Sequence, residues 1–449
     1  MGVTLQAAPQ SERSKEKSFA WKEPLERTTF TIQGGRKLSG TYPVQGNKNA
    51  ALPLIAASLL SSRPVTFRRV PRIRDVLNLL RLVEAQGARV EWDEHGLVID
   101  PGSMKDSASM PDDLVRRLRG CVLLLAPLAH RYGRVSCTLP GGCPIGRRSF
   151  EAHWSVFRAA GFEVREREGR IEIERLRPES APQVFLRQAS VTGTENALLL
   201  FAALGRGRIE NPAREPHVLA LIDFLQQLGC CIESHPLHFE VTRGVDPEAG
   251  PVEFEVPADY IDAGTLAIAA AVTHGEVVLE GVTSRELTGI RPFLEDFGVV
   301  FERAGQRAYR VHRTELRNPE QLTAGLWPLF PTDLISLAIV MAVQSEGLCL
   351  IHDWMYEARM FFVDKLVRMG ARITLCDPHR VLVEGTGRLR GITLESPDIR
   401  AGMALIVAGL CAEGTTTIEH GEVIMRGYES VSERLRAVGA CIKSSASDT

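Results

Sequence analysis

The chain has 449 residues, which is too long for one ordinary hydrophobic core and predicts two or more domains. Its formal net charge of −2 provides no overall basic field that would attract nucleic acid or an anionic membrane. The longest apolar run, near residues 337–343, is far shorter than the ~18 residues that a membrane-spanning helix needs. Small molecules are therefore the expected partners, and arginines gathered at one place could still form a local anion site.

The N-terminal segment and the cysteines indicate the cellular compartment of the protein. Residues 1–28 are polar with nearly balanced charges and contain no apolar stretch typical of a secretory signal, so we expect a disordered tail. Nine cysteines without an export signal are typical of a protein in a reducing cytoplasm. The sequence has no CxxC pair, so a zinc site is not expected.

A repeat of about 70 residues runs along the chain. In each copy an amphipathic helix stops at a glycine and the chain restarts as a strand, as in EAQGARVEW and RAVGACIKS. Glycine at this place allows the positive φ that commonly ends a helix. The six glycines are Gly87, Gly161, Gly229, Gly298, Gly370 and Gly439.

Each copy also contains a helix that is apolar nearly all round and should be buried, followed by a strand. In chain order these segments are NAALPLIAASLLSSRPVTF, GCVLLLAPLAHRYGRVSC, TENALLLFAALGRGRIEN, AGTLAIAAAVTHGEVVLEG, TDLISLAIVMAVQSEGLCLIHD and AGMALIVAGLCAEGTTTIEH. Six copies predict an α/β protein with two domains of three repeats each. Its helices should lie inside and its strands outside, the reverse of the usual barrel.

Two loops carry residues that suit chemistry on an anion. In GNKNAALP, Lys48 and Asn49 open an apolar helix, whose N-terminus attracts anions, although a capped helix start also explains them. In LPGGCPIGRR, Cys143 lies among glycines with Arg147 and Arg148 close by. Arginines bind phosphate and carboxylate bidentately, and nearby positive charge favours the thiolate. The alternative is a surface turn with solvated arginines.

Further candidates stand where repeat units begin. FPTDLIS places Asp333 at the start of an apolar helix, where it could cap the helix or accept a proton from a substrate hydroxyl. Arginines at equivalent unit starts should converge on one face and hold a small, multiply charged anion. These arginines are Arg119, Arg359, Arg400 and Arg426.

In combination, the motifs GNKNAALPL, LPGGCPIGRR, SVTGTENALL, AREP, FPTD, DIRAGMALIVAG and RGYE resemble those of the UDP-N-acetylglucosamine 1-carboxyvinyltransferase family, from about Phe30 to about Lys443. The resemblance implies two inside-out α/β barrel domains with six pseudosymmetric βαβαββ-type repeats and an active site in the interdomain cleft. We expect one domain from residues 29–46 with 258–449 and the other, which carries the cysteine loop, from residues 47–257.

The resemblance also implies an activity and roles for residues. Enolpyruvate would pass from phosphoenolpyruvate to the 3′-hydroxyl of UDP-N-acetylglucosamine by addition and elimination, without a metal or organic cofactor. Cys143 is implied as the proton donor and Asp333 as the residue that deprotonates the sugar hydroxyl. The implied phosphoenolpyruvate site contains Lys48, Asn49, Arg148, Arg359, Arg400 and Arg426. The implied UDP-sugar site contains Arg119, Ser190, Val191, Asp333 and Met355.

Several positions depart from the family pattern, most of them on the nucleotide-sugar side. Gln188 stands where a lysine is common beside the substrate diphosphate, and His217 replaces an expected glutamate. The missing lysine leaves open an enolpyruvyl transferase that acts on another nucleotide acceptor, such as UMP. The shikimate-pathway enzyme lacks a loop like PGGCPIG and fits less well. A UDP-sugar sensor without activity would not need a proton donor.

Overall fold

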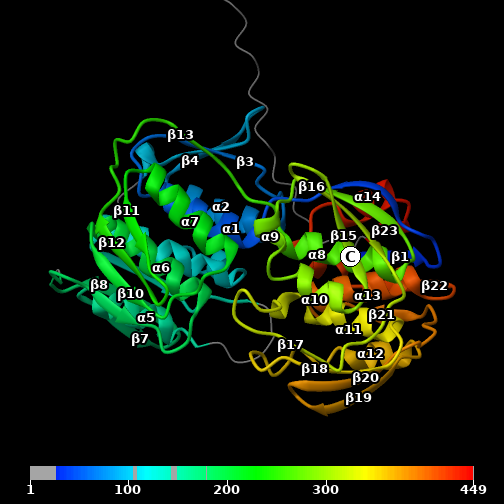
Figure 1. The fold of residues 1–449 in the computed structure, drawn as a ribbon. Coiled ribbons are helices and arrows are strands. Elements are labelled where there is room, and N and C mark those ends of the chain that lie inside the picture. The colour runs from blue at the N-terminus through cyan, green and yellow to red at the C-terminus, as the bar shows by residue number, and fades with distance from the viewer. Residues whose placement is uncertain (1–26, 105–108, 143–148, 178, 448–449) are drawn as a thin grey trace, which may run out of the picture.

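The computed structural model describes residues 27–104, 109–142, 149–177 and 179–447. Figure 1 shows an α/β molecule of two lobes that lie side by side. The first lobe has a hydrophobic core with residues from Ala50 to Val256. The second lobe has a separate core, with residues from Phe30 to Val44 and from Ala258 to Ile442. The domain boundaries expected at residues 46 and 258 remain a proposal, and the division between the two cores supports it.

Three buried helices fill the centre of each lobe. In the first lobe they are α1 (Lys48–Ser58), α4 (Leu125–Tyr132) and α6 (Val191–Leu204). In the second lobe they are α8 (Tyr260–Val272), α11 (Ile335–Gln344) and α13 (Ile399–Cys411). Every residue of α8 is buried, as expected for a helix without a polar face. The expectation that the apolar helices lie inside is confirmed.

Six sheets surround these helices, three in each lobe. The sheets of the first lobe contain β13 (Val252–Glu255), β3 (Val65–Arg68), β5 (Leu97–Asp100) and β4 (Arg89–Trp92); β6 (Arg134–Thr138), β8 (Arg170–Arg175) and β7 (Phe162–Arg167); and β11 (Cys231–Ser234), β12 (His238–Arg243), β10 (Gly207–Glu210) and β9 (Gln183–Phe185). The sheets of the second lobe contain β15 (Val299–Gly305), β16 (Ala308–Arg313), β14 (Glu276–Glu280) and β2 (Ser39–Pro43); β17 (Gln321–Thr323), β18 (Leu348–His352), β20 (Arg380–Glu384) and β19 (Arg372–Asp377); and β21 (Thr393–Glu395), β22 (Thr415–Glu419), β1 (Arg27–Gln33) and β23 (Cys441–Ser447).

Amphipathic helices and short helical turns complete the repeats. The longer ones are α2 (Arg74–Ala85), α5 (Glu151–Ala159), α7 (Pro216–Gln227), α10 (Arg291–Asp296), α12 (Val363–Arg368) and α14 (Val431–Ala437). The short ones are α3 (Asp112–Val115), α9 (Ser284–Leu287), η1 (Pro101–Ser103), η2 (Arg119–Leu124), η3 (Thr332–Leu334) and η4 (Gly421–Arg426). The six glycines predicted to end helices all have positive φ, between 83° and 108°. None of these elements is long and apolar enough to cross a membrane, among the residues that the structure describes.

The repeats are nearly symmetric. Each four-stranded sheet contains one parallel strand pair, such as β9 with β10 or β2 with β14. In the three-stranded sheet an isolated parallel bridge from Ser109 to Ser136 of β6 lies at the corresponding place. The predicted tail is two residues too long, because Arg27 and Thr28 already belong to β1, where Thr28 pairs with Ala446 of β23.

The chain passes between the lobes at two places that lie side by side. Gly46 forms an antiparallel bridge with Ala258, and the Asn47 N–H donates to the Pro257 carbonyl at 2.8 Å. The Asp259 N–H donates to the Gln45 carbonyl at 2.9 Å. These bonds join the lobes just before α1 and α8 begin, so both helices start at the boundary between the lobes.

Candidate functional site

A cavity of about 380 Å³ lies between the lobes, and residues of both form its walls. The N-terminal end of each buried helix, or the turn before it, contributes to the lining. The contributing residues are Lys48 of α1, Arg119 before α4, Ser190 before α6, Tyr260 of α8, Asp333 before α11 and Asp398 before α13. Because a helix N-terminus carries partial positive charge, six such ends around one cavity favour an anionic ligand.

Lys48 and Arg426 meet on a shared carboxylate. The Lys48 ammonium lies 2.8 Å from Asp75 Oδ2, and Arg426 Nε lies 3.0 Å from Asp75 Oδ1. Asp75 is in α2 of the first lobe and Arg426 ends η4 of the second, so this cluster joins the two lobes. Burial alone would raise the pKa of Asp75, but Lys48 and Arg426 outweigh burial and lower it. The cluster therefore consists of a carboxylate and two cations beside the cavity.

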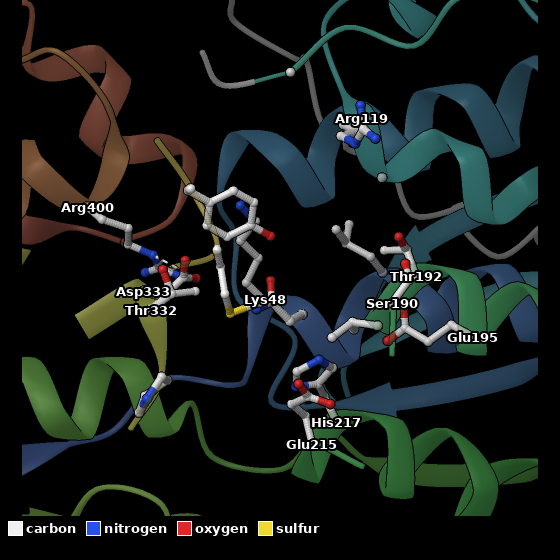
Figure 2. A pocket seen from close by; sticks show the side chains of 18 of the residues that line it. Lys48, Arg119, Ser190, Thr192, Glu195, Glu215, His217, Thr332, Asp333 and Arg400 are labelled. Carbon is white, nitrogen blue, oxygen red and sulfur yellow. Dashed lines mark hydrogen bonds and ion pairs between the residues drawn. The ribbon is translucent and has the colours of Figure 1, made fainter. Parts of the chain in front are cut away.

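Asp333 holds two further predicted arginines. Arg359 Nη2 donates to Asp333 Oδ1 at 3.0 Å, and Arg400 donates to Oδ2 through Nε at 3.1 Å and Nη2 at 2.9 Å. The residue before η3 is Pro331, and no side chain caps this turn. The alternative of Asp333 as a helix cap is therefore wrong. The figure of the site shows Asp333 beside Arg400, with Lys48 facing them across the cavity (Figure 2).

The acidity of Asp333 follows from these neighbours. Burial by itself would raise the pKa of this carboxyl, but the charges of Arg400, Arg359 and Lys48 outweigh burial and hold the pKa well below its usual range. Among the described residues, Arg359 Nε and Arg400 Nη1 have no hydrogen-bond partner, although Arg359 Nε lies 4.0 Å from Asp353 Oδ2. An anion in the cavity could use these remaining donors.

The expected nucleotide-sugar residues line the other part of the same cavity. Arg119 Nη2 donates to the Ser149 carbonyl at 3.1 Å, and its guanidinium stacks on the Phe150 ring at 4.0 Å. Ser190 caps α6, because its hydroxyl accepts the Gly193 N–H at 3.2 Å. Val191 begins the helix, and Met355 comes from the facing lobe.

The predicted residues in the described part of the chain thus gather at one cavity. They are Lys48, Asn49, Arg119, Ser190, Val191, Asp333, Met355, Arg359, Arg400 and Arg426. Cys143, Arg147 and Arg148 lie outside the described residues. The residues on either side of that segment, Gly142 and Ser149, line the cavity.

Other residues of the cavity were not predicted from the sequence. Asp75 carried a signal, since it is a carboxylate on the buried face of an amphipathic helix. Glu195 also carried one, as an acidic residue within the apolar segment TENALLLF. Glu215 and His217, at the start of α7, lie beside Glu195 in the cavity wall. His217 was noticed only as a departure from the family pattern.

A possible metal site lies elsewhere. Among the described residues, one group has ligand atoms close enough for a metal ion: His235, His238 and Glu240 on the β11–β12 hairpin. None of the three lines the cavity between the lobes. The cavity itself presents both cations and carboxylates, and the helix N-termini around it favour an anion.

Comparisons with known proteins agree with this geometry. The family model described as EPSP synthase (3-phosphoshikimate 1-carboxyvinyltransferase) matches residues 32–435. The chain belongs to this enolpyruvyl transferase family. A UDP-N-acetylglucosamine 1-carboxyvinyltransferase from Bradyrhizobium diazoefficiens is 41% identical over 92% of this chain and 97% of its own length. One from Treponema denticola is 37% identical over 92% of this chain and 98% of its own length.

Solved structures of enolpyruvyl transferases share the fold. The enolpyruvyl transferase NikO from Streptomyces tendae matches 94% of this chain and 100% of its own with a TM-score of 0.84 and 24% identity. An EPSP synthase from Acinetobacter baumannii matches 93% of this chain and 100% of its own with a TM-score of 0.72 and 20% identity. The predicted α/β fold with two inside-out barrels is thereby confirmed.

Proposed function

We propose that this protein transfers the enolpyruvyl group of phosphoenolpyruvate to the 3′-hydroxyl of UDP-N-acetylglucosamine and releases phosphate. One observation carries the proposal. In a chain of this family, cations from both lobes and the positive ends of six helices surround a single cavity. Phosphoenolpyruvate, with a phosphate and a carboxylate on three carbons, is an anion that such a cavity stabilises.

The reaction needs two bond changes at the enol carbons. In the addition step the acceptor oxygen bonds to C2 of phosphoenolpyruvate while C3 gains a proton, which forms a tetrahedral ketal. In the elimination step the bond from C2 to the phosphate oxygen breaks and C3 loses a proton, which restores the double bond. From its sequence motif, we assign Cys143 the proton transfer at C3, since a thiol beside arginines can alternate between thiol and thiolate near neutral pH.

The cations hold the charged groups during these steps. Lys48 and Arg426 come from opposite lobes and both pair with Asp75. We assign them to one negative group of phosphoenolpyruvate, which they would bind from two sides. We assign Arg359 and Arg400 to the second negative group, because each has a nitrogen without a hydrogen-bond partner among the described residues. We assign Asn49 and Arg148 to the same substrate from their motifs alone.

Asp333 orients the acceptor hydroxyl and receives its proton. While two arginines hold the carboxylate, it is a weak base. A substrate anion that binds Arg359 and Arg400 neutralises part of their charge, and the pKa of Asp333 then rises. We assign Arg119, Ser190, Val191 and Met355, which line the same cavity, to the nucleotide sugar.

Phosphate release with a panel of acceptors tests the proposal. The purified protein is incubated with phosphoenolpyruvate and, in turn, UDP-N-acetylglucosamine, UMP and shikimate 3-phosphate. We expect release with UDP-N-acetylglucosamine, as the names of relatives at 36–41% identity suggest. Release with UMP alone would instead favour the alternative acceptor to which Gln188 points.

The proposed product is a precursor of peptidoglycan, so we place the reaction at the first committed step of that synthesis. Both proposed substrates carry phosphate groups and do not cross a lipid bilayer unaided, because burying a charge in hydrocarbon is costly. We therefore place the activity in the cytoplasm, in agreement with the cysteine usage of the chain.

A further inference from the structure

One wall of the cavity carries acidic and imidazole groups that the proposed mechanism does not use. Glu195 lies in the first turns of α6, while Glu215 precedes α7 and His217 is its second residue. Glu195 and His217 are buried, with 1% and 2% of their surface exposed. Figure 2 shows the three side chains close together at the side of the cavity away from Arg400.

These side chains have unused hydrogen-bonding atoms. Glu195 Oε1, Glu215 Oε2 and both ring nitrogens of His217 are buried and have no partner among the described residues. An unpaired buried polar atom costs about 1–3 kcal/mol, so four of them in one place call for an explanation. A ligand that pairs with them in the cavity supplies it.

Burial shifts the pKa of each of the three groups toward its uncharged form. Burial raises the pKa of Glu195, and the neighbouring Glu215 raises it further. Burial likewise raises the pKa of Glu215, although two backbone N–H groups partly oppose this. Burial lowers the pKa of His217 to about 4, and the charge of Asp333 opposes the shift only in part. Neutral carboxyl groups and a neutral imidazole each donate and accept hydrogen bonds.

Arg214, which directly precedes Glu215 in the sequence, makes its contacts away from this wall of the cavity. Arg214 Nη1 donates to the Ser234 hydroxyl at 3.3 Å, and its guanidinium stacks on the Phe239 ring at 4.7 Å. On the inner side His217 stacks on Tyr260, with the rings 6.2 Å apart and nearly parallel. This wall therefore combines unpaired hydrogen-bonding groups with an aromatic ring, and it differs from the cationic part around Lys48 and Arg400.

We propose that Glu195, Glu215 and His217 form a hydrogen-bonding subsite that binds the hydroxyl and acetamido groups of the acceptor's sugar and so selects a sugar nucleotide over a nucleotide alone. The subsite depends on the proposed function in one respect, which is that the acceptor carries a sugar. Among the residues that the structure describes, no ion pair joins these three groups to a cation, so a phosphate at this wall would face carboxyl oxygens. A sugar offers several neutral donors and acceptors, which match the unpaired atoms.

Calorimetric binding of UDP-N-acetylglucosamine and of UDP tests the subsite. The measured quantity is the ratio of the two dissociation constants. The wild-type protein should bind the sugar nucleotide at least about 10-fold more tightly than UDP, since one or two hydrogen bonds are worth this much. A ratio near one for the wild type would overturn the proposal without any variant.

Variants then assign the preference to residues. Glu195→Met and Glu215→Met keep the side-chain size but remove the polar atoms, and each should reduce the ratio about 10-fold or more while the affinity for UDP stays the same. Glu195→Gln should keep most of the preference, because the amide still offers polar atoms that hydrogen-bond to a sugar. Glu84→Gln, in α2 outside the cavity, is the matched control.

Two results contradict the subsite. One is an unchanged ratio in both methionine variants, and the other is an equal loss of affinity for UDP and for the sugar nucleotide, which a merely structural role would produce. Turnover is measured separately. If the wild type binds UDP-N-acetylglucosamine with the expected ratio but releases no phosphate, the proposed function fails and the subsite stands.

Discussion

Replacing Asp75 with asparagine removes the carboxylate that Lys48 and Arg426 share across the two lobes. The amide keeps the size of the side chain but carries no charge. Two cations then lie together without the negative charge that now separates them. The contact between α2 and η4 loses its ion pair with Arg426, and α1 loses the ion pair of Lys48. We expect a less stable protein whose lobes are held together less firmly.

The size of the effect follows from burial. Removing one partner of a buried ion pair costs about 3–5 kcal/mol. The side chains of Lys48 and Arg426 keep 12% and 21% of their surface exposed, while Asp75 keeps 4%, so water screens part of the loss. We therefore take the lower end, about 3 kcal/mol, which lowers the melting temperature of a domain of this size by about 6–12 °C.

The pH dependence has a definite sign. The folded pKa of Asp75 is lowered, so its contribution is fully present above the unfolded pKa of about 4 and is lost as pH falls through the folded value. The difference between wild type and variant should therefore be the same at pH 7 and at about pH 5, where both states keep the carboxylate ionised.

Thermal unfolding at pH 7, with and without inorganic phosphate, measures the effect. Phosphate binds the folded state and should stabilise Asp75→Asn more than the wild type, because it replaces the missing negative charge. Glu248→Gln, which removes an exposed ion pair with Arg63, is the control and should change stability by less than about 0.5 kcal/mol. A variant that melts within ~2 °C of the wild type, or gains no extra stability from phosphate, would refute the reasoning.

Three further predictions concern other parts of the site. Asp333→Asn should lower kcat by about 100- to 10,000-fold with little change in acceptor binding, which steady-state kinetics and calorimetry measure, and near-normal turnover would exclude a base. Burial, with a smaller effect of Arg119, lowers the pKa of His153 to about 3, so below pH 6.5 the folded state binds fewer protons than the unfolded state. Denaturant unfolding should therefore show that the free energy of unfolding is about 3 kcal/mol lower at pH 4.5 than at pH 7. This decrease should be smaller in His153→Gln. Fosfomycin, an epoxide similar to phosphoenolpyruvate in charge and size, should label Cys143, faster with the sugar nucleotide bound; mass spectrometry would detect the adduct, and labelling of another cysteine would contradict the assignment.

The repeat was predictable because each copy needs the same two local features, a glycine that ends one helix and a second helix that is apolar on all sides. A helix must end before the next strand can begin, and Gly87 and Gly439 solve this at opposite ends of the chain with the same positive φ. A helix such as α8 needs to be apolar on all sides when three sheets surround its bundle. Strand pairing could not be derived, because β1 pairs with β23 from the far end of the chain and no local pattern encodes that contact.

The sequence predicted which cations belong to the site, but it did not predict the hydrogen bonds and ion pairs that connect them. Repeat symmetry indicated that Arg359 and Arg400 would converge, but their shared bond to Asp333 depends on side-chain directions that the sequence does not show. Asp75 escaped notice because a single aspartate on an amphipathic helix is usually exposed. Glu195 is unusual as an acidic residue within an apolar segment, but the sequence does not show that it faces the cavity, which depends on the packing of α6.

Four carboxylates of the cavity fall into two kinds, and the difference orders the proposed reaction. Asp75 and Asp333 pair with cations that lower their pKa, whereas burial raises the pKa of Glu195 and Glu215. A substrate anion must compete with the first kind for Lys48 and the arginines. When it succeeds, Asp333 loses part of its charge stabilisation and becomes a better proton acceptor. Asp333 therefore deprotonates the acceptor hydroxyl only after phosphoenolpyruvate has bound. The deprotonated oxygen then lies beside C2, the carbon to which it bonds.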